Sequence, residues 1–241
     1  MEKTQLFSLD ITFEKEDFDD VNLKPFSIMQ KFQTIATSHA ENLGLDYHSM
    51  LKKNLLWITM RIKYKIDKMP ASGQKLVLKT YPLAKNMIEF DRDFLIETEN
   101  GEILIRGTSK WCLIDKDTRK LCRMSSIDYD FENVYGTAFE GKFLKTDTFV
   151  PEFAPDYSYQ VIDSDIDVNG HMNNTMYSKI IGNFIKHNGK KIEEYQVNFL
   201  KEAFLGNRID VYIKKDGNNL NILGKLCEGE NCFSAYITYQ K

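Results

Sequence analysis

Two long segments of the chain carry apolar residues at the three- and four-residue spacing of an amphipathic helix. The first segment covers residues 27–44 and the second covers residues 173–189. Each ends at a glycine, Gly44 or Gly189, and glycine is the residue that most often follows the last turn of a helix. The pattern therefore predicts one long helix in each half of the chain, with one apolar face to bury.

After each helix, apolar and polar residues alternate, which is typical of half-buried strands. The clearest alternation runs over residues 57–66, where these side chains are expected to face a core: Ile58, Met60, Ile62, Tyr64 and Ile66. A turn at Asn100-Gly101 between two such runs indicates a β-hairpin. Further runs follow the second helix, over residues 194–204, 208–215, 220–228 and 231–240. We expect antiparallel strands after both helices.

Both halves of the chain have the same order of elements: an extended segment, a long helix and then several strands. Such repetition indicates a duplicated unit. We predict an N-terminal domain over residues 1–125, a crossover linker over 126–150 and a C-terminal domain over 151–241. The predicted fold class is α+β, with an antiparallel sheet wrapped around the helix of each domain.

Candidate chemistry is concentrated directly before the second helix, in the run DVNGH, residues 167–171. Residues two apart in an extended chain project to the same side, so the carboxylate, amide and imidazole of this run could converge. Gly170 would permit a sharp turn. The unpaired N–H groups at the start of the helix, where Asn173 and Asn174 lie, could stabilise an oxyanion. The run thus supplies the groups needed for attack on a carbonyl carbon.

The same residue types also form turns and helix caps, with Asn174 as a candidate N-cap, so a structural role explains them as well. The first helix provides a comparison. It begins at KPFSIMQ, residues 24–30, which contains none of these polar groups. Because a purely structural requirement would be expected at both helices, this difference favours a functional role for the second.

The composition excludes few classes of binding partner and few cellular compartments. The 241 residues carry a net charge of −3, which gives no overall basic surface for nucleic acid. No apolar run approaches the length of a membrane span, and the acidic N-terminus lacks a signal-peptide core. The four cysteines match no zinc spacing; they are Cys112, Cys122, Cys227 and Cys232. We expect free thiols, no metal and a cytoplasmic setting.

The run DVNGHMNNTMY, residues 167–177, resembles the signature of acyl-acyl carrier protein thioesterases, the fatty-acid-releasing enzymes of plants and bacteria. Three segments of the first half resemble the same family in order and spacing: residues 57–82, 92–102 and 108–124. The resemblance covers nearly the whole chain. It implies a tandem (double) hotdog fold and hydrolysis of a fatty acyl thioester held on acyl carrier protein. It implies no cofactor, because the phosphopantetheine arrives on the carrier.

By this resemblance, Asp167, Asn169 and His171 match the catalytic Asp, Asn and His of the family. In the plant enzymes a later Arg-Glu-Cys segment follows, and its Glu and Cys have both been discussed as catalytic. The matching segment here is Lys201-Glu202-Ala203, which keeps the glutamate but has alanine at the cysteine position. A Cys-His-Asn mechanism is therefore not expected for this chain.

The expected reaction needs an activated nucleophile and a stabilised oxyanion. Asp167 or Glu202 would act as general base on a water molecule, and direct carboxylate attack through a transient anhydride is the alternative route. Asn169 would orient the base or hold the thioester carbonyl. His171 would position the water or protonate the leaving thiolate.

The acyl chain would need an apolar pocket, for which the candidates near the first helix are Met29, Phe32, Trp57 and Met60. Ordinary core packing explains the same residues. An acidic carrier protein would need a basic docking surface, for which the candidates are Arg61, Lys63 and Lys65. A solvated outer face of a sheet explains that pattern as well.

Three other functions remain open at this stage. The chain could hydrolyse acyl-coenzyme A, it could be a hotdog dehydratase acting on 3-hydroxyacyl thioesters, or it could bind acyl groups without catalysis. Acyl carrier protein and a fatty acyl thioester are the expected partners, with no nucleic acid and no membrane span. A tandem chain already contains a pair of hotdogs, so a monomer and a homodimer are both allowed.

Overall fold

The computed structural model describes residues 5–83, 86–128, 135–139, 141–144, 149, 151–185 and 189–240. The chain divides into two compact units. Residues 1–14 and 31–141 make up the N-terminal unit, and residues 15–30 and 142–241 make up the C-terminal unit. About half of the predicted linker at 126–150 lies outside the described residues, and the predicted domain limits stay predictions.

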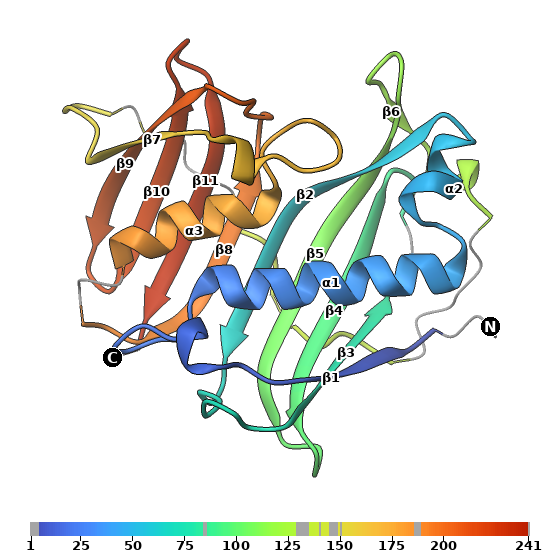
Figure 1. Ribbon diagram of the computed structural model, residues 1–241, viewed down its shortest axis with the longest axis horizontal. Coiled ribbons are helices and arrows are strands. Elements are labelled where there is room, and N and C mark those ends of the chain that lie inside the picture. The colour runs from blue at the N-terminus through green and yellow to red at the C-terminus, as the bar shows by residue number, and fades with distance from the viewer. Residues whose placement is uncertain are drawn as a thin grey trace. The chain divides into compact units, whose positions relative to one another are not determined.

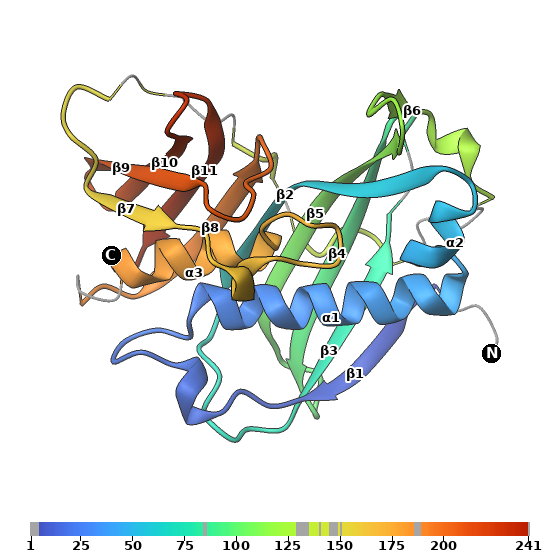
Figure 2. The same cartoon turned by 45° about the horizontal axis from the view of Figure 1, so that its top comes forward.

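The N-terminal unit is an antiparallel sheet with a long helix across it (Figure 1). Its hydrogen-bonded strands have the order β1-β3-β4-β5-β2, and β6 pairs with β5. The strands are β1 (Phe7–Ile11), β2 (Leu55–Ile66), β3 (Leu76–Pro82), β4 (Glu89–Thr98), β5 (Ile103–Asp115) and β6 (Leu121–Cys122). Helix α1 (Pro25–Leu43), most of which belongs to this unit, lies across these strands in both views (Figures 1 and 2), and the short helix α2 (Tyr47–Leu51) follows it.

Helix α1 ends where the sequence predicts. Gly44 has a φ of 71°, which glycine adopts without a steric penalty. The amide of Leu45 then donates to the Ala40 carbonyl at 2.8 Å, and the amide of Gly44 donates to the Glu41 carbonyl at 3.1 Å. These two bonds form a Schellman motif, which satisfies carbonyls that the last turn leaves unpaired.

The core of the N-terminal unit is built around the ring of Phe32 on α1. This ring stacks on Phe94 of β4 at a centroid distance of 4.3 Å and meets Tyr64 of β2 edge-on at 6.5 Å. It also occupies the space beside Gly107 of β5, where an added Cβ would lie 2.4 Å from the ring. Phe32 is completely buried, so this aromatic contact fixes the position of the helix on the sheet.

The predicted alternation along residues 57–66 is wrong in its first half. The pairing of β2 with β5 shifts register between Thr59 and Arg61, which marks a β-bulge. Thr59 before the bulge is buried, whereas Met60, which was expected to face the core, is only half-buried. A bulge adds one residue to a strand and so reverses which side chains face the core.

The polar alternation suggested that the outer face of this sheet is solvated. In the structure, part of this face is covered. Lys63 on β2 is 6% exposed, because the segment that contains Phe139 and Gly141 covers it. Its ammonium group donates to the Gly141 carbonyl at 2.8 Å and lies 4.0 Å from the centroid of the Phe139 ring. In the same segment, the Ala138 amide donates to Asp93 Oδ2 of β4 at 2.6 Å. The segment is therefore fixed to the sheet by two buried charged side chains.

The C-terminal unit repeats the arrangement on a smaller scale. Its antiparallel strands have the order β8-β11-β10-β9-β7. They are β7 (Tyr157–Gln160), β8 (Ile192–Phe199), β9 (Arg208–Asp216), β10 (Asn219–Leu226) and β11 (Asn231–Tyr239). Helix α3 (Asn174–Ile185) lies across this sheet (Figure 1). The prediction of an antiparallel sheet with a long helix in each half is thus confirmed.

Two tyrosines connect α3 to its sheet. The ring of Tyr177 lies between those of Phe199 and Phe233, at centroid distances of 5.7 Å and 5.2 Å. The hydroxyl of Tyr195 on β8 forms a hydrogen bond of 2.8 Å with Ser178 Oγ on the helix. These contacts fix the start of α3, the end that follows the predicted site.

The burial of Asp93 generates a prediction about pH. Asp93 is 1% exposed, its Oδ1 atom has no hydrogen-bond partner, and burial raises the pKa of its carboxyl group. The folded protein therefore binds this proton more tightly than the unfolded chain does, so this group reduces stability as pH rises above the usual range of an aspartate. We expect Asp93→Asn to raise the free energy of unfolding at pH 7, with a gain that shrinks as the pH falls toward about 4.

Urea denaturation of both proteins between these pH values measures the effect. Asp91→Asn is the matched control, because Asp91 lies on the same strand but forms an ion pair with Lys110 at 3.0 Å. That variant should gain nothing at neutral pH. An Asp93→Asn protein no more stable than the wild type at pH 7 would contradict the assignment.

Candidate active site

The predicted run at residues 167–171 forms a tight loop immediately before α3. The amide of Asp167 donates to the His171 carbonyl at 3.0 Å, and the amide of Gly170 donates to the Asp167 carbonyl at 3.0 Å. Gly170 has a φ of 81°, as the predicted sharp turn requires. The side chains converge because the chain reverses direction here, and not because it is extended as the sequence suggested.

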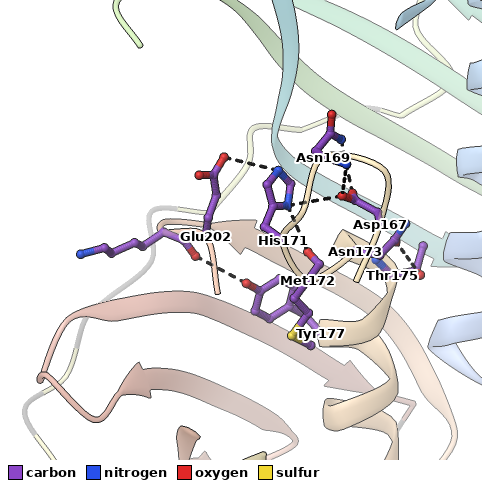
Figure 3. A network of polar contacts seen from close by, with 9 residues as sticks. Asp167, Asn169, His171, Met172, Asn173, Thr175, Tyr177 and Glu202 are labelled. Atoms are coloured by element: carbon purple, nitrogen blue, oxygen red, sulfur yellow. Dashed lines mark hydrogen bonds and ion pairs between the residues drawn. The ribbon is translucent and has the colours of Figure 1, made fainter. Parts of the chain in front are cut away.

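The imidazole of His171 lies between two carboxylates (Figure 3). Its Nδ1 atom is 3.9 Å from Asp167 Oδ1, and its Nε2 atom is 3.5 Å from Glu202 Oε1. Nδ1 is also 3.5 Å from the carbonyl oxygen of Met172. Hydrogen-bond acceptors therefore lie beside both ring nitrogens of His171.

Asp167 is oriented by Asn169. The backbone amide of Asn169 donates to Asp167 Oδ1 at 2.8 Å, and its side-chain amide approaches Asp167 Oδ2 at 3.4 Å. Asn169 therefore directs its donors toward the carboxylate. The Asp167 side chain is 18% exposed and that of Glu202 is 32% exposed, so Glu202 is the more accessible of the two carboxylates.

The segment that carries Glu202 is attached to the loop by the backbone. The amide of Met172 donates to the carbonyl of Ala203 at 2.7 Å, one residue from His171 on one side and one residue from Glu202 on the other. The Ala203 side chain is completely buried. The structure thus brings together all four residues predicted to act in the reaction: Asp167, Asn169, His171 and Glu202.

The helix start differs from the prediction by one residue. The N-cap is Asn173, whose Oδ1 atom accepts from the Thr175 amide at 2.9 Å and from the Thr175 hydroxyl at 2.8 Å. Asn174 is instead the first residue of α3. The Met176 amide donates to the Asn173 carbonyl. Two of the N–H groups expected to stabilise an oxyanion are therefore engaged within the helix, and the role of Asn173 and Asn174 stays a prediction.

Asp165 supports the loop, although nothing in the sequence pattern distinguished it. Its carboxylate accepts from the Tyr159 hydroxyl at 2.7 Å and from the Ile162 amide at 3.0 Å. Its carbonyl accepts from the Asn173 amide at 2.8 Å. Burial and the neighbouring Asp165 carboxylate raise the pKa of Tyr159, so the phenol stays protonated as a donor. No local pattern in the sequence indicated this role of Asp165, because its bonds connect a strand, a 3₁₀ turn and the start of a helix.

The residues predicted to line an acyl pocket or to dock the carrier lie far from this loop in the sequence, and they differ in how deeply they are buried. Met29 and Phe32 are buried, whereas Trp57 and Met60 are half-buried. Contact of these four with an acyl chain stays a prediction. Of the basic residues, Arg61 and Lys65 are half-buried, and the expectation that Lys63 is accessible to a partner is wrong because Phe139 and Gly141 cover it.

The cysteines are free, as predicted, and two of them are buried. Burial raises the pKa of Cys232 to about 12 and also raises that of Cys112, so neither thiol is a nucleophile at neutral pH. Among the described residues, no cluster of three or more His, Cys, Asp or Glu side chains is arranged to hold a metal ion. No described helix has the length and hydrophobicity needed to span a membrane.

The fold and the site define a class: two hotdog units in one chain, one of which carries an imidazole between two carboxylates at the start of its helix. The acyl-ACP thioesterase N-terminal domain matches residues 5–129, and the acyl-ACP thioesterase C-terminal domain matches residues 152–241. The chain belongs to the acyl-ACP thioesterase family.

Characterised relatives agree with this assignment. Over 168 residues, or 63% of this chain, it is 27% identical to an oleoyl-acyl carrier protein thioesterase of Arabidopsis thaliana, and it is 31% identical over 170 residues to a palmitoyl-acyl carrier protein thioesterase of Gossypium hirsutum. These matches cover 46% and 40% of the two relatives, so the chain spans less than half of their length.

Solved structures show the same fold. An acyl-ACP thioesterase from Bacteroides thetaiotaomicron superposes with a TM-score of 0.81 over 98% of each chain, at 20% identity. A 12:0-ACP thioesterase from Umbellularia californica gives the same score over 98% of each chain, at 19% identity. The predicted tandem hotdog fold is thereby confirmed.

The burial of Cys232 gives a prediction about the mechanism. Its carbonyl anchors the chain next to Glu202, but its thiol is protonated and buried. We expect Cys232→Ala to retain kcat within about threefold and to lose about 1 kcal/mol of stability from the missing sulfur. Thioester hydrolysis and thermal unfolding of the variant measure the two effects. A loss of activity of a hundredfold or more in a folded variant would implicate a cysteine.

Proposed function

We propose that this protein hydrolyses fatty acyl thioesters of acyl carrier protein, releasing a free fatty acid and the carrier thiol. Membership of the acyl-ACP thioesterase family supports the substrate class. The observation that carries the proposal is the position of His171, which lies between the carboxylates of Asp167 and Glu202. An imidazole between carboxylates can transfer a proton to or from a reacting water.

In the proposed reaction, Glu202 is the general base. It is the more exposed carboxylate and faces His171 Nε2, whereas Asp167 is engaged by two donors of Asn169. Glu202 takes a proton as the water oxygen bonds to the thioester carbon. The tetrahedral intermediate then expels the thiolate as the C–S bond breaks, and the sulfur receives the proton that Glu202 took from the water, which restores the carboxylate. Asp167 and Asn169 keep the imidazole in one orientation, as a carboxylate does in other proton-transfer sites.

The rival route begins with direct attack of the Glu202 carboxylate on the thioester, giving a mixed anhydride that water then hydrolyses. The same geometry permits it, because Glu202 is partly exposed. Hydrolysis in water enriched in oxygen-18 distinguishes the routes under single-turnover conditions. Label found in Glu202 after the single turnover supports the anhydride, because only attack of water on the glutamyl carbon of that intermediate places oxygen-18 there.

The assignment of residues predicts a graded loss of activity. Glu202→Gln should lower kcat by about 10²–10⁴-fold, because an amide cannot accept the proton. Asp167→Asn and His171→Ala should lower it as well, with KM changed less than kcat. Steady-state release of free thiol from an acyl carrier thioester measures this. Glu228→Gln, at an exposed carboxylate in the same unit, is the control and should keep full activity.

The result that would refute the assignment of Glu202 is wild-type kcat in a folded Glu202→Gln protein. Equal activity of Asp167→Asn and the wild type would similarly remove Asp167 from the mechanism. Circular dichroism of each variant confirms that the fold is retained.

The carrier is tested by placing one acyl group on acyl carrier protein and on coenzyme A. We expect kcat/KM to be higher on the protein carrier by about tenfold, which corresponds to about 1.4 kcal/mol of additional transition-state binding. Faster hydrolysis of the coenzyme A ester would make the chain an acyl-coenzyme A thioesterase instead. Dehydration of a 3-hydroxyacyl thioester without thiol release would identify a dehydratase.

A further inference from the structure

The turn between β8 and β9 carries Glu202 and exposes large apolar side chains before and after it in the sequence. The segment at Ile162 adjoins this turn, because the Gly206 amide donates to the carbonyl of Val161 at 3.0 Å. The large apolar residues exposed here, each by 45–58%, are Ile162, Leu200, Phe204 and Leu205, which we call the apolar rim. Single apolar residues are common on a protein surface, whereas several on adjoining segments mark a site of interaction.

The turn between β2 and β3 in the N-terminal unit is built in the same way. Its Gly73 amide donates to the carbonyl of Phe13 at 2.8 Å, as the Gly206 amide does to its partner in the C-terminal unit. The pattern of exposed, half-buried and buried residues is identical over residues 67–75 and 200–208. The chain therefore holds two copies of this turn, one in each unit.

An ion pair recurs in the two copies as well. Lys68 pairs with Glu102 in the first copy, and Lys201 pairs with Glu230 in the second. In both cases the glutamate directly follows the glycine of a hairpin turn. The two turns thus agree in how they are attached within their own unit, so each residue of one is a matched comparison for the residue at the same place in the other.

The two copies differ at the positions of the apolar rim. The first copy has small or acidic residues there: Glu14, Asp67, Ala71 and Ser72 take the places of Ile162, Leu200, Phe204 and Leu205. The backbone of the turn therefore does not require large apolar side chains. The first copy also has Met69 where the second has Glu202. The apolar rim occurs only beside the carboxylate assigned to the reaction, which indicates a role in that reaction.

We propose that the apolar rim is the docking surface for acyl carrier protein, which rests on it while the thioester reaches Glu202. The inference rests on the proposed function, because that function supplies the partner. Leu200 and Phe204 are each two residues from Glu202, so the rim is continuous with the site. Its side chains are exposed on a turn, and they therefore meet a partner that stays outside the protein. The carrier is that part of the substrate, since only the acyl group and the end of its arm have to reach the carboxylate.

The double variant Phe204→Ala with Leu205→Ser tests the apolar rim, because it gives the second turn the residues that the first turn already holds in the same backbone. The matched control is Ala71→Phe with Ser72→Leu, which makes the reverse exchange in the first turn. We expect the rim variant to raise KM for an acyl carrier thioester about tenfold with kcat unchanged. Its kcat/KM on the coenzyme A ester of the same acyl group should stay within about twofold of the wild type, because that ester has the same arm and no carrier protein. The control should match the wild type on both substrates, and both variants should show the wild-type circular dichroism spectrum.

Titration of isotopically labelled holo acyl carrier protein, which carries no acyl group, measures docking by NMR without hydrolysis. We expect the rim variant to bind this carrier about tenfold more weakly than the wild type, and the control to bind it equally well. Equal binding by the rim variant would overturn the inference. An equal loss of kcat/KM on the carrier thioester and the coenzyme A ester would also overturn it, because the rim would then contact the acyl chain or the arm.

The oligomeric state of the rim variant tests the other occupant of such a surface, a second copy of the chain. A rim variant that sediments as a monomer where the wild type sediments as a dimer would overturn the inference, and an unchanged sedimentation coefficient supports it. If the wild-type protein bound the holo carrier but hydrolysed no acyl thioester, the proposed function would fail. The binding of the two variants would still decide whether the rim is the docking surface.

Discussion

The hydrogen bond from the Met172 amide to the Ala203 carbonyl is the contact on which the geometry of the site depends. His171 and Glu202 lie on different segments, and each is one residue away from this 2.7 Å bond. Because the bond joins backbone atoms, neither side chain has to provide the attachment. The distance of 3.5 Å between the imidazole and the Glu202 carboxylate follows from how the two chains are joined.

Hydrophobic periodicity predicted the elements of the fold well, because each long helix and most strands bury one continuous face. The end of α1 at Gly44 was also predictable, since the signal is local. The bulge in β2 was not, because an extra residue is recognised only when the partner strand is known. The burial of Lys63 depends in the same way on a distant segment, which supplies the Gly141 carbonyl and the Phe139 ring.

The residues of the site were also predictable only where the signal is local in the sequence. A short run of sequence predicted that Asp167, Asn169 and His171 would converge, although the loop reverses direction where an extended chain was expected. Glu202 was found by resemblance alone, because no spacing rule connects it to His171. Tyr177 matched the apolar face of the predicted helix, and it does pack there as a ring.

The alanine at the position of the plant cysteine is consistent with these contacts. Ala203 takes part through its backbone: its carbonyl accepts from the Met172 amide at 2.7 Å. Its methyl group is completely buried, and the bond to Met172 does not involve the side chain, so this bond does not require a particular side chain at the position. A carboxylate held by such a backbone needs no neighbouring thiol. The physical requirement is that the turn be rigid, and hydrogen bonds with the loop at Met172 and with the strand at Cys232 together supply that rigidity.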